Sequence, residues 1–363
     1  MHTALVAIGA LSPALWLAVL LAPVRPWDLQ PVGEDAEEPP SPAGWPEVCA
    51  VVPARNEEAY LPRTLPALLA QDYPGRLRVL VVDDRSSDGT AAAARAAGAE
   101  LVEGAPLPEG WVGKVWALEQ GARAAGAPDY LLLTDADILH APGSLRRLVA
   151  ESEAWGLALN SRMALLRAET GWERLLVPPF LLFFNLLYPM RWANDPRRRL
   201  AAAAGGCILL HRGAASFEQI RGAVIDDVSL ARAVKRGGGR LRLAVSRADV
   251  ASLRAHGSLG PLWRMVARTA WVQLGRSWTL LAATLLGLAL LFPVPVLLLA
   301  AVVYEPVAAA LGALAWGCSS LVFRPAVRHF GLGRAWSWTL PLAGTLYGAM
   351  TLDSALRGRG DWD

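Results

Sequence analysis

This sequence is organised around DYLLLTDAD, residues 129–137. The apolar part of the stretch is short and rich in leucine, which is typical of a buried strand in a parallel sheet. Ligands of open α/β sheets bind just beyond the carboxyl ends of the strands, and Asp135 and Asp137 stand at that position. Two carboxylates so close together repel each other unless a positive charge, such as a hard divalent cation, lies between them. The stretch therefore predicts a metal that bridges the protein to a diphosphate, with a turn or a helix cap as the alternative.

The region before this strand alternates between strand and helix patterns. Strand candidates cover residues 48–53, 77–82, 99–103 and 130–134, and helix candidates cover residues 57–71, 88–97 and 114–125. Such alternation predicts an α/β fold with a parallel, Rossmann-like sheet. The chain has no G-x-G-x-x-G motif, so we expect a ligand other than a dinucleotide.

Polar residues gather where these strands end. The first strand leads into PARNEE (residues 53–58), the second into DDRSSDGT (residues 83–90), and the fourth into the pair Asp135 and Asp137. The carboxyl ends of neighbouring parallel strands meet at one edge of a sheet, so these segments should converge on a single crevice. Any one of them could be only a helix cap, but the three together predict a binding site.

The composition indicates a soluble domain joined to membrane segments. Of the 363 residues, 54% are hydrophobic, which is too many for an ordinary soluble protein, while 18% are charged, which is too many for a pure membrane bundle. The net charge of +3 argues against a dedicated nucleic-acid-binding protein. Cys49, Cys207 and Cys318 are far apart in the sequence and suggest neither a metal site nor a disulfide framework.

Apolar segments at both ends predict attachment to a membrane. Residues 3–22 could span a bilayer, giving an anchor over residues 1–23, with a cleaved signal peptide as the alternative. A Pro-rich, acidic linker is expected over residues 24–47. Three more spans are expected within residues 277–353, before a tail of residues 354–363; their limits are 278–301, 306–323 and 336–352. Basic residues beside membrane spans usually lie in the cytoplasm, which predicts a cytoplasmic catalytic side and a tail outside. These residues are Arg25, Arg324, Arg328 and Arg334.

Two other segments are expected to lie at the membrane surface. Residues 172–192 are largely apolar but contain Pro178-Pro179 and are too short to span, and a buried core helix is the alternative for them. Residues 257–276 have the pattern of an amphipathic helix. The aromatic residues expected at headgroup depth are Trp172, Tyr188 and Trp192.

Three motifs, taken together, resemble those of the family 2 glycosyltransferases of the GT-A fold. They are VVPARNEE (residues 51–58), VVDDRSSDGT (residues 81–90) and TDADI (residues 134–138), and the resemblance covers roughly residues 48–245. The stretch GWVGKVWA, residues 110–117, and the anchored layout are most similar to the hopene-associated, membrane-bound members. The expected catalytic domain spans residues 48–256.

The resemblance implies a nucleotide-sugar donor and Mg²⁺ or Mn²⁺ as the cofactor. Asp137 would be the main metal ligand, and Asp135 would lie near the ribose and the metal. Lys114 would face the diphosphate as a point charge, with a solvated helix start as the alternative. Asp83 or Asp84 would accept a hydrogen bond from the uracil N–H. The residues that would line the nucleotide pocket are Pro53, Ala54, Arg55 and Glu57.

The stretch VIDDVSL, residues 224–230, resembles the Glu-Asp motif whose aspartate is the family's general base. Asp227 aligns with that base, and Asp226 replaces the glutamate. A neighbouring acid and an apolar wall would raise the pKa of Asp227 toward neutrality. The alternative is that both aspartates cap the helix expected over residues 228–235. The family has a Gln-x-x-Arg-Trp motif, of which this chain keeps only the arginine, Arg268. By resemblance, Arg268 would hold the diphosphate. The loss of the other motif residues argues against a processive polysaccharide synthase.

These inferences predict an inverting, metal-dependent glycosyltransferase in the inner membrane, with its catalytic domain in the cytoplasm. The expected donor is a nucleotide-sugar, with a UDP-sugar preferred. The expected acceptor is a lipid hydroxyl, and a hopanoid or another polyisoprenoid lipid follows from the resemblance alone. The alternatives are an enzyme that extends a polysaccharide and a non-catalytic membrane scaffold. The identity of the sugar depends on pocket shape, which motifs do not encode.

Overall fold

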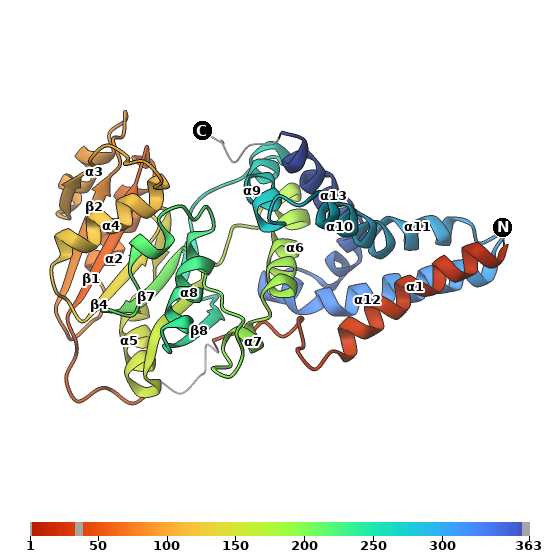
Figure 1. Ribbon diagram of the computed structural model, residues 1–363, viewed down its shortest axis with the longest axis horizontal. Coiled ribbons are helices and arrows are strands. Elements are labelled where there is room, and N and C mark those ends of the chain that lie inside the picture. Colours follow the sequence, from red (N-terminus) through yellow and green to blue (C-terminus); the bar gives the residue numbers. More distant parts are fainter. Residues whose placement is uncertain (1, 33–38, 358–363) are drawn as a thin grey trace. The chain divides into compact units, whose positions relative to one another are not determined.

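The computed structural model describes residues 2–32 and 39–357 (Figure 1). The chain divides into two compact units. The α/β unit contains residues 30–167 and 190–254, and the helical unit contains residues 1–29, 168–189 and 255–363.

The first half of the α/β unit confirms the predicted alternation of strands and helices. β1 pairs in parallel with β2 and with β4, and β2 pairs in parallel with β3. The helix expected over residues 57–71 is shorter, because Asn56 has a φ of 56° and the residues before Leu61 form a turn. The elements are β1 (Val48–Ala54), α2 (Leu61–Leu69), β2 (Leu77–Asp83), α3 (Thr90–Ala97), β3 (Glu100–Glu103), α4 (Gly113–Ala125) and β4 (Tyr130–Thr134).

The second half adds antiparallel strands, so the seven-stranded sheet is mixed. Its order is β3-β2-β1-β4-β7-β6-β8, and β7 runs antiparallel to both β4 and β6. A small second sheet pairs β5 with β9. The elements are β5 (Ile138–His140), α5 (Ser144–Trp155), β6 (Leu157–Met163), α7 (Met190–Ala193), β7 (Cys207–His211), η1 (Phe217–Ile220), α8 (Asp226–Arg236), β8 (Arg240–Val245) and β9 (Val250–Ser252).

Helices cover both faces of the large sheet, because the strands are apolar on both sides. One buried cluster joins the sheet to α2, α3 and α5, and the other joins it to α4 and α8. Alternate residues of β1 divide between them: Val52 belongs to the first cluster and Val51 to the second. Gly121 allows α4 to approach the sheet closely, since a Cβ there would lie 2.3 Å from Cγ1 of Val51. The sheet is therefore the rigid base from which the strand ends project.

The expected linker is partly tied to the α/β unit. Pro31 forms a bridge with Val245 at the end of β8, and the N–H of Val32 donates to the Val245 carbonyl at 3.0 Å. Residues 33–38 of the expected linker lie outside the described residues. Backbone hydrogen bonding thus fixes residues 31 and 32 to the sheet edge.

The helical unit collects the apolar segments. α1 packs along α12, and the Trp16 Nε1–H donates to the carbonyl of Leu291 at 3.2 Å. α9 is the expected amphipathic helix: Leu262 and Val266 are buried, and the helix packs against α13. The elements are α1 (His2–Leu21), α6 (Gly171–Leu187), α9 (Leu259–Gln273), α10 (Trp278–Leu291), α11 (Pro293–Ala300), α12 (Pro306–His329), η2 (Arg334–Thr339) and α13 (Leu340–Leu356).

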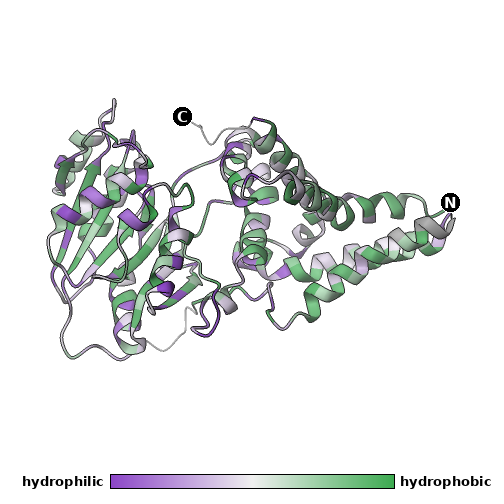
Figure 2. Cartoon of the chain, in the orientation of Figure 1, coloured by the Kyte–Doolittle hydropathy of each residue, from purple (hydrophilic) through white to green (hydrophobic). Residues whose placement is uncertain are grey.

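Two described segments are long and apolar enough to cross a membrane by length and composition: Trp278–Ala300 and Pro306–His329. A buried core helix can meet the same criterion, but only 17% of the apolar window in Trp278–Ala300 is buried, against 50% in Pro306–His329. Figure 2 shows apolar residues along most of α10 and α11. These two segments match two of the expected spans.

Among the described residues, two of the four expected spans meet this criterion. α1 has 20 residues, and its apolar part among the described residues is Gly9–Leu21. The expected span over residues 336–352 begins in η2, and α13 itself has 17 residues. One side of α13 packs against other helices of this unit, since Tyr347 is buried and its hydroxyl donates to the Leu176 carbonyl of α6 at 2.8 Å. Hydropathy alone could not show this packing.

The segment expected at the membrane surface, residues 172–192, crosses both units. Its first part is α6, whose apolar residues are mostly buried against α12 and α13, so the buried core helix considered for it describes this part better. Tyr188, expected at headgroup depth, is buried, and its hydroxyl donates to Oε1 of Gln273 at 2.7 Å. Trp172 and Trp192 are exposed.

Candidate active site

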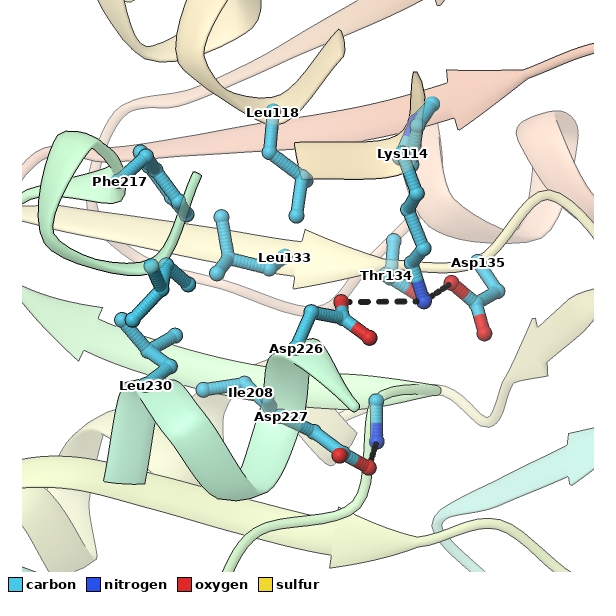
Figure 3. A pocket seen from close by; sticks show the side chains of 13 residues that line it. Lys114, Leu118, Leu133, Thr134, Asp135, Ile208, Phe217, Asp226, Asp227 and Leu230 are labelled. Carbon is cyan, nitrogen blue, oxygen red and sulfur yellow. Dashed lines mark hydrogen bonds and ion pairs between the residues drawn. The ribbon is translucent and has the colours of Figure 1, made fainter. Parts of the chain in front are cut away.

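A lysine and three aspartates meet where β4 ends and α4 and α8 begin (Figure 3). The Lys114 Nζ lies 2.7 Å from Oδ1 of Asp135 and 3.6 Å from Oδ2 of Asp226. Asp227 lines the same pocket, one residue further into α8. The apolar part of the pocket wall is formed by Pro53, Leu118, Leu133, Ile208, Phe217, Ile220 and Leu230.

Local structure explains why these side chains converge. β4 ends at Thr134, which directs Asp135 beyond the sheet edge, and the Thr134 hydroxyl donates to the Gly206 carbonyl at 2.9 Å. Lys114 is in the first turn of α4, and both aspartates are in the first turn of α8. Gly205 leaves them room, since a Cβ there would lie 3.2 Å from Nζ of Lys114.

Asp227 is held by backbone groups. Its Oδ2 accepts from the N–H of Gly205 at 3.0 Å, and its Oδ1 accepts from the N–H of Val228 at 2.7 Å. Burial and then the negative charge of Asp226 raise the pKa of Asp227 to about 7, although Lys114 and the two backbone hydrogen bonds act in the opposite direction. The expected shift toward neutrality is therefore present. Asp227 is a first-turn residue and not the N-cap, which is Ile225.

Lys114 stays protonated in this setting. Burial alone would lower its pKa, but the carboxylates of Asp135 and Asp226 outweigh burial and raise it. The pKa of Asp135 is raised by burial in spite of the ion pair with Lys114. The alternative of a solvated helix start does not describe Lys114, because its ammonium group joins two carboxylates from separate elements.

Asp137 lies apart from this cluster in its contacts and is buried. Its Oδ2 accepts from the Ser252 hydroxyl at 2.7 Å and from Nε of Arg254 at 3.2 Å. The Nη2 of Arg254 also donates to Oε1 of Glu57 at 2.6 Å, and its guanidinium lies over the ring of Tyr60. The pKa of Glu57 is raised by burial, with Arg254 opposing the shift.

Sequence reasoning missed Ser252 and Arg254. The pairing of β5 with β9 places Ser252 opposite Ile138, the residue after Asp137. These residues are more than 100 positions away from Asp137 in the chain, and no local motif marks them. The signal in the sequence was an arginine two residues after the short strand that ends at Ser252.

The first two strand ends are joined by side-chain hydrogen bonds. The N–H of Asn56 donates to the Ser86 hydroxyl at 2.9 Å, and the N–H of Ser87 donates to Oδ1 of Asn56 at 2.8 Å. The N–H of Glu57 donates to Thr90 Oγ1 at 2.7 Å. The structure thus brings the PARNEE and DDRSSDGT segments together, as their positions after parallel strands predict.

The residues expected to bind the nucleotide occupy different surroundings. Asp83 Oδ1 accepts from the N–H of Ser86 at 3.0 Å, so this carboxylate stabilises its own turn. Asp84 Oδ2 lies 3.9 Å from Nη1 of Arg55, whose side chain is largely exposed. Ala54 is buried at the end of β1, and only its backbone could contact a ligand.

Comparison with known proteins identifies the domain. Residues 49–215 match the model of the family described as Glycosyl transferase family 2. The chain carries a family 2 glycosyltransferase domain. Its mixed sheet with a parallel centre is the Rossmann-like GT-A fold.

Curated relatives of this glycosyltransferase domain match over part of their length. An N-acetylglucosaminyltransferase of Mesorhizobium japonicum is 33% identical over 186 residues, which are 49% of this chain and 42% of that protein. A 4,4'-diaponeurosporenoate glycosyltransferase of Staphylococcus haemolyticus is 38% identical over 93 residues, which are 25% of this chain and 24% of that protein. The chain therefore spans less than half the length of these relatives.

One solved structure shares the fold over nearly the whole chain. It is a mannosyltransferase from Pyrobaculum calidifontis in complex with GDP-Man and Mn²⁺. The TM-score is 0.55 at 20% identity, and the match covers 97% of this chain and 99% of that one. At this identity the likeness concerns the fold alone.

The family implies a divalent metal, which the carboxylates of the glycosyltransferase domain would have to bind. No group of three or more His, Cys, Asp or Glu side chains within the described residues could enclose an ion. Asp135 and Asp137 instead each face a cationic side chain, Lys114 and Arg254. Two carboxylates fit an ion such as Mg²⁺ or Mn²⁺ whose other ligands are substrate phosphates and water. Arg268 is exposed on α9 of the helical unit, and its binding role stays a prediction.

Proposed function

We propose that this protein is an inverting glycosyltransferase that moves a sugar from a nucleotide-sugar, preferably a UDP-sugar, to a lipid hydroxyl. The observation that carries the proposal is the position of Asp227 in the Lys114 pocket. A half-buried aspartate with a pKa raised to about 7 lies beside the ammonium group that pairs with Asp135. This arrangement combines a base with charged groups suited to a diphosphate.

The proposed reaction uses Asp227 as the general base. Its carboxylate takes the proton of the acceptor hydroxyl as the oxygen attacks the anomeric carbon from the face opposite the diphosphate. The bond between that carbon and the diphosphate oxygen breaks, and its electron pair leaves with the nucleoside diphosphate. Asp226 raises the basicity of Asp227, as its effect on the pKa supports. The configuration at the anomeric carbon is inverted in a single displacement.

The donor would be held at the three strand ends. Lys114 would bind the diphosphate, and Asp135 and Asp137 would hold Mg²⁺ or Mn²⁺. When bound, this metal neutralises charge on the leaving diphosphate. Asp84 is the better placed of the two candidates for the uracil N–H, because Asp83 already accepts from the N–H of Ser86. The other nucleotide contacts would come from Pro53, Ala54, Arg55 and Glu57.

The lipid acceptor rests on two supports. One relative is named for 4,4'-diaponeurosporenoate, and the helical unit exposes large apolar side chains on Trp278–Ala300, among them Leu286 and Leu297. A hopanoid or another polyisoprenoid lipid remains the preferred acceptor from the resemblance of the motifs. In this proposal the α/β unit is catalytic and lies in the cytoplasm, and the helical unit is attached to the membrane.

The proposed membrane attachment is a hairpin of Trp278–Ala300 and Pro306–His329. Lys and Arg are absent between Arg276 and Arg324, so basic residues flank the hairpin only at its open end. This pattern places the open end in the cytoplasm and the turn around Tyr304 outside. Two crossings return the chain to the cytoplasm, so α13 would lie on that side, in place of the tail expected outside.

Cysteine labelling tests this attachment. Tyr304→Cys and Ala335→Cys both place a thiol at an exposed position, while Cys49, Cys207 and Cys318 are buried. In intact bacterial cells an impermeant maleimide should label only the Tyr304→Cys variant, and in inverted vesicles only the Ala335→Cys variant. Labelling of both from one side would exclude a crossing hairpin.

Transferase activity is tested with the detergent-purified chain, a panel of UDP- and GDP-sugars, Mn²⁺ and a bacterial lipid extract. Release of nucleotide with one donor, lost in Asp227→Asn and Asp137→Asn and in chelator, would support the proposal. Arg95→Gln is a matched control, since Arg95 forms an exposed ion pair with Glu103. Mass analysis of the lipid should show one added sugar, whereas a long polymer would favour polysaccharide extension. No donor binding by calorimetry would favour the scaffold alternative.

A further inference from the structure

We infer that Arg254 competes with the divalent ion for Asp137, and that Glu57 retains the arginine when the ion binds. The inference rests on the proposed metal-binding role of Asp137. It assigns a positioning role to Arg254, a residue for which the motifs predict none.

The geometry shows one guanidinium shared by two carboxylates. Arg254 Nε lies 3.2 Å from Asp137 Oδ2, and its Nη2 lies 2.6 Å from Glu57 Oε1. The Tyr60 ring lies under the guanidinium, with 4.8 Å between Cζ and the ring centroid. The carboxylate side chains of Asp137 and Glu57 are only 11% and 16% exposed. Two poorly hydrated negative charges need a nearby cation, and Arg254 supplies it.

A divalent ion bound to Oδ2 of Asp137 would have to replace this contact, and an ion on the other carboxylate oxygen would lie close to the positive guanidinium. The guanidinium and the ion are both positive, so they cannot share the same carboxylate oxygen without strong repulsion. Arg254 therefore lowers the affinity of Asp137 for the ion. Ser252 does not oppose the ion through charge, because its hydroxyl is neutral.

Glu57 offers a second position for the displaced guanidinium. Its Oε2 is buried and has no hydrogen-bond partner among the described residues. A small rotation could let a second N–H of Arg254 donate to this oxygen, giving a two-bond pairing of guanidinium and carboxylate. Glu57 thus favours the state in which Asp137 is released. The arrangement keeps the buried acids neutralised both before and after the ion binds.

The experiment measures Mn²⁺ affinity without nucleotide, using the full-length chain in detergent and the free-ion signal in electron paramagnetic resonance. Arg254→Gln should bind Mn²⁺ about fivefold more tightly, since it removes a half-exposed charge-assisted hydrogen bond. Glu57→Gln should bind about threefold more weakly, since Arg254 then remains on Asp137. Arg95→Gln should match the wild type. A merely structural loss at Arg254 would weaken binding and would not tighten it.

The double variant Arg254→Gln/Glu57→Gln distinguishes this mechanism from independent effects of the two charges on Mn²⁺ affinity. If Glu57 acts through Arg254, Glu57→Gln should have no further effect in the Arg254→Gln background, whereas independent charges would give additive effects. Additivity, unchanged or weaker binding by Arg254→Gln, or no Mn²⁺ binding by any variant would each overturn the inference. Transfer activity that still requires Mn²⁺ would then leave the proposed function standing, and activity insensitive to chelator would remove the metal role as well.

Discussion

The two aspartate pairs of the α/β unit differ in what lies next to them. Asp135 and Asp137, after β4, each form an ion pair with a cationic side chain, Lys114 or Arg254. Asp227, at the start of α8, accepts hydrogen bonds from two backbone N–H groups and has Asp226 as its neighbour. We propose on this basis that the first pair holds cations and that Asp227 takes a proton. The same residue type thus acquires different chemistry from its surroundings.

The largest effect on the transfer rate is expected when Asp227, the proposed proton acceptor, is replaced. Asp227→Asn should lower the transfer rate by about 10²–10⁴-fold, the usual contribution of a general base. Donor affinity measured by calorimetry should change little, because Asp227 is proposed to act on the acceptor. Equal losses of donor affinity and rate would assign Asp227 to donor binding.

The same variant has a predicted effect on stability. Between the ordinary aspartate pKa and about 7, the folded state binds more protons at Asp227 than the unfolded state does, so the contribution of this group to stability falls as the pH rises. Asp227→Asn removes that loss. Its thermal midpoint relative to wild type should therefore increase as the pH is raised from the ordinary aspartate value of about 4 to about 7 and level off above 7, and a constant difference would contradict the raised pKa.

A somewhat smaller effect is expected at the cation-binding pair. Asp137→Asn should lower the rate in Mn²⁺ by about 10²–10³-fold, since a metal supplies several kcal/mol of charge stabilisation. Raising the Mn²⁺ concentration should recover part of this loss, but none of the loss in Asp227→Asn. Recovery of both variants, or of neither, would remove the distinction between the pairs.

Lys114 connects the two pairs, and its removal should shift the pH dependence. Lys114 lowers the pKa of Asp227, so Lys114→Met should move the acid limb of the rate profile to higher pH. Lys114→Arg keeps the charge and should leave the limb near its original position. A limb that does not move in Lys114→Met would show that the rate does not report on Asp227.

The smallest effect is expected from the neighbouring acid. Asp226→Asn removes a negative charge that raises the pKa of Asp227, so the acid limb should move to lower pH, with a loss of rate of about tenfold at neutral pH. The profiles of Asp226→Asn and Lys114→Met should therefore shift in opposite directions. A shift in the same direction would contradict the assignment of the base.

Local sequence patterns predicted the first four strands and the polar segments that follow them. Each of these strands is an apolar run, and polar residues follow it directly, so both the strand and its ligand-facing end are visible in the sequence. The structure brings Asp135, Asp226 and Asp227 into one pocket with Lys114, and the roles expected for them stay predictions. The pKa shift of Asp227 followed from an apolar wall and an adjacent acid, both readable from the chain.

Features that depend on distant contacts could not be predicted in this way. Arg254 reaches Asp137 only because β9 pairs with β5, and β7 makes the sheet mixed through pairing with β4 and β6. α13 resembles a span in hydropathy, but Tyr347 and its neighbours are buried against other helices. Burial and pairing partners are properties of the fold, and apolar composition is the same for a lipid-facing and a protein-facing helix.

The pH dependence of sugar transfer by the wild-type protein tests the central assignment most directly. With Asp227 as the base, the rate at saturating donor should rise about tenfold per pH unit below 7 and level off above it. A profile that is flat from about pH 5 to 8, or a rise centred near the ordinary aspartate value of about 4, would contradict the account.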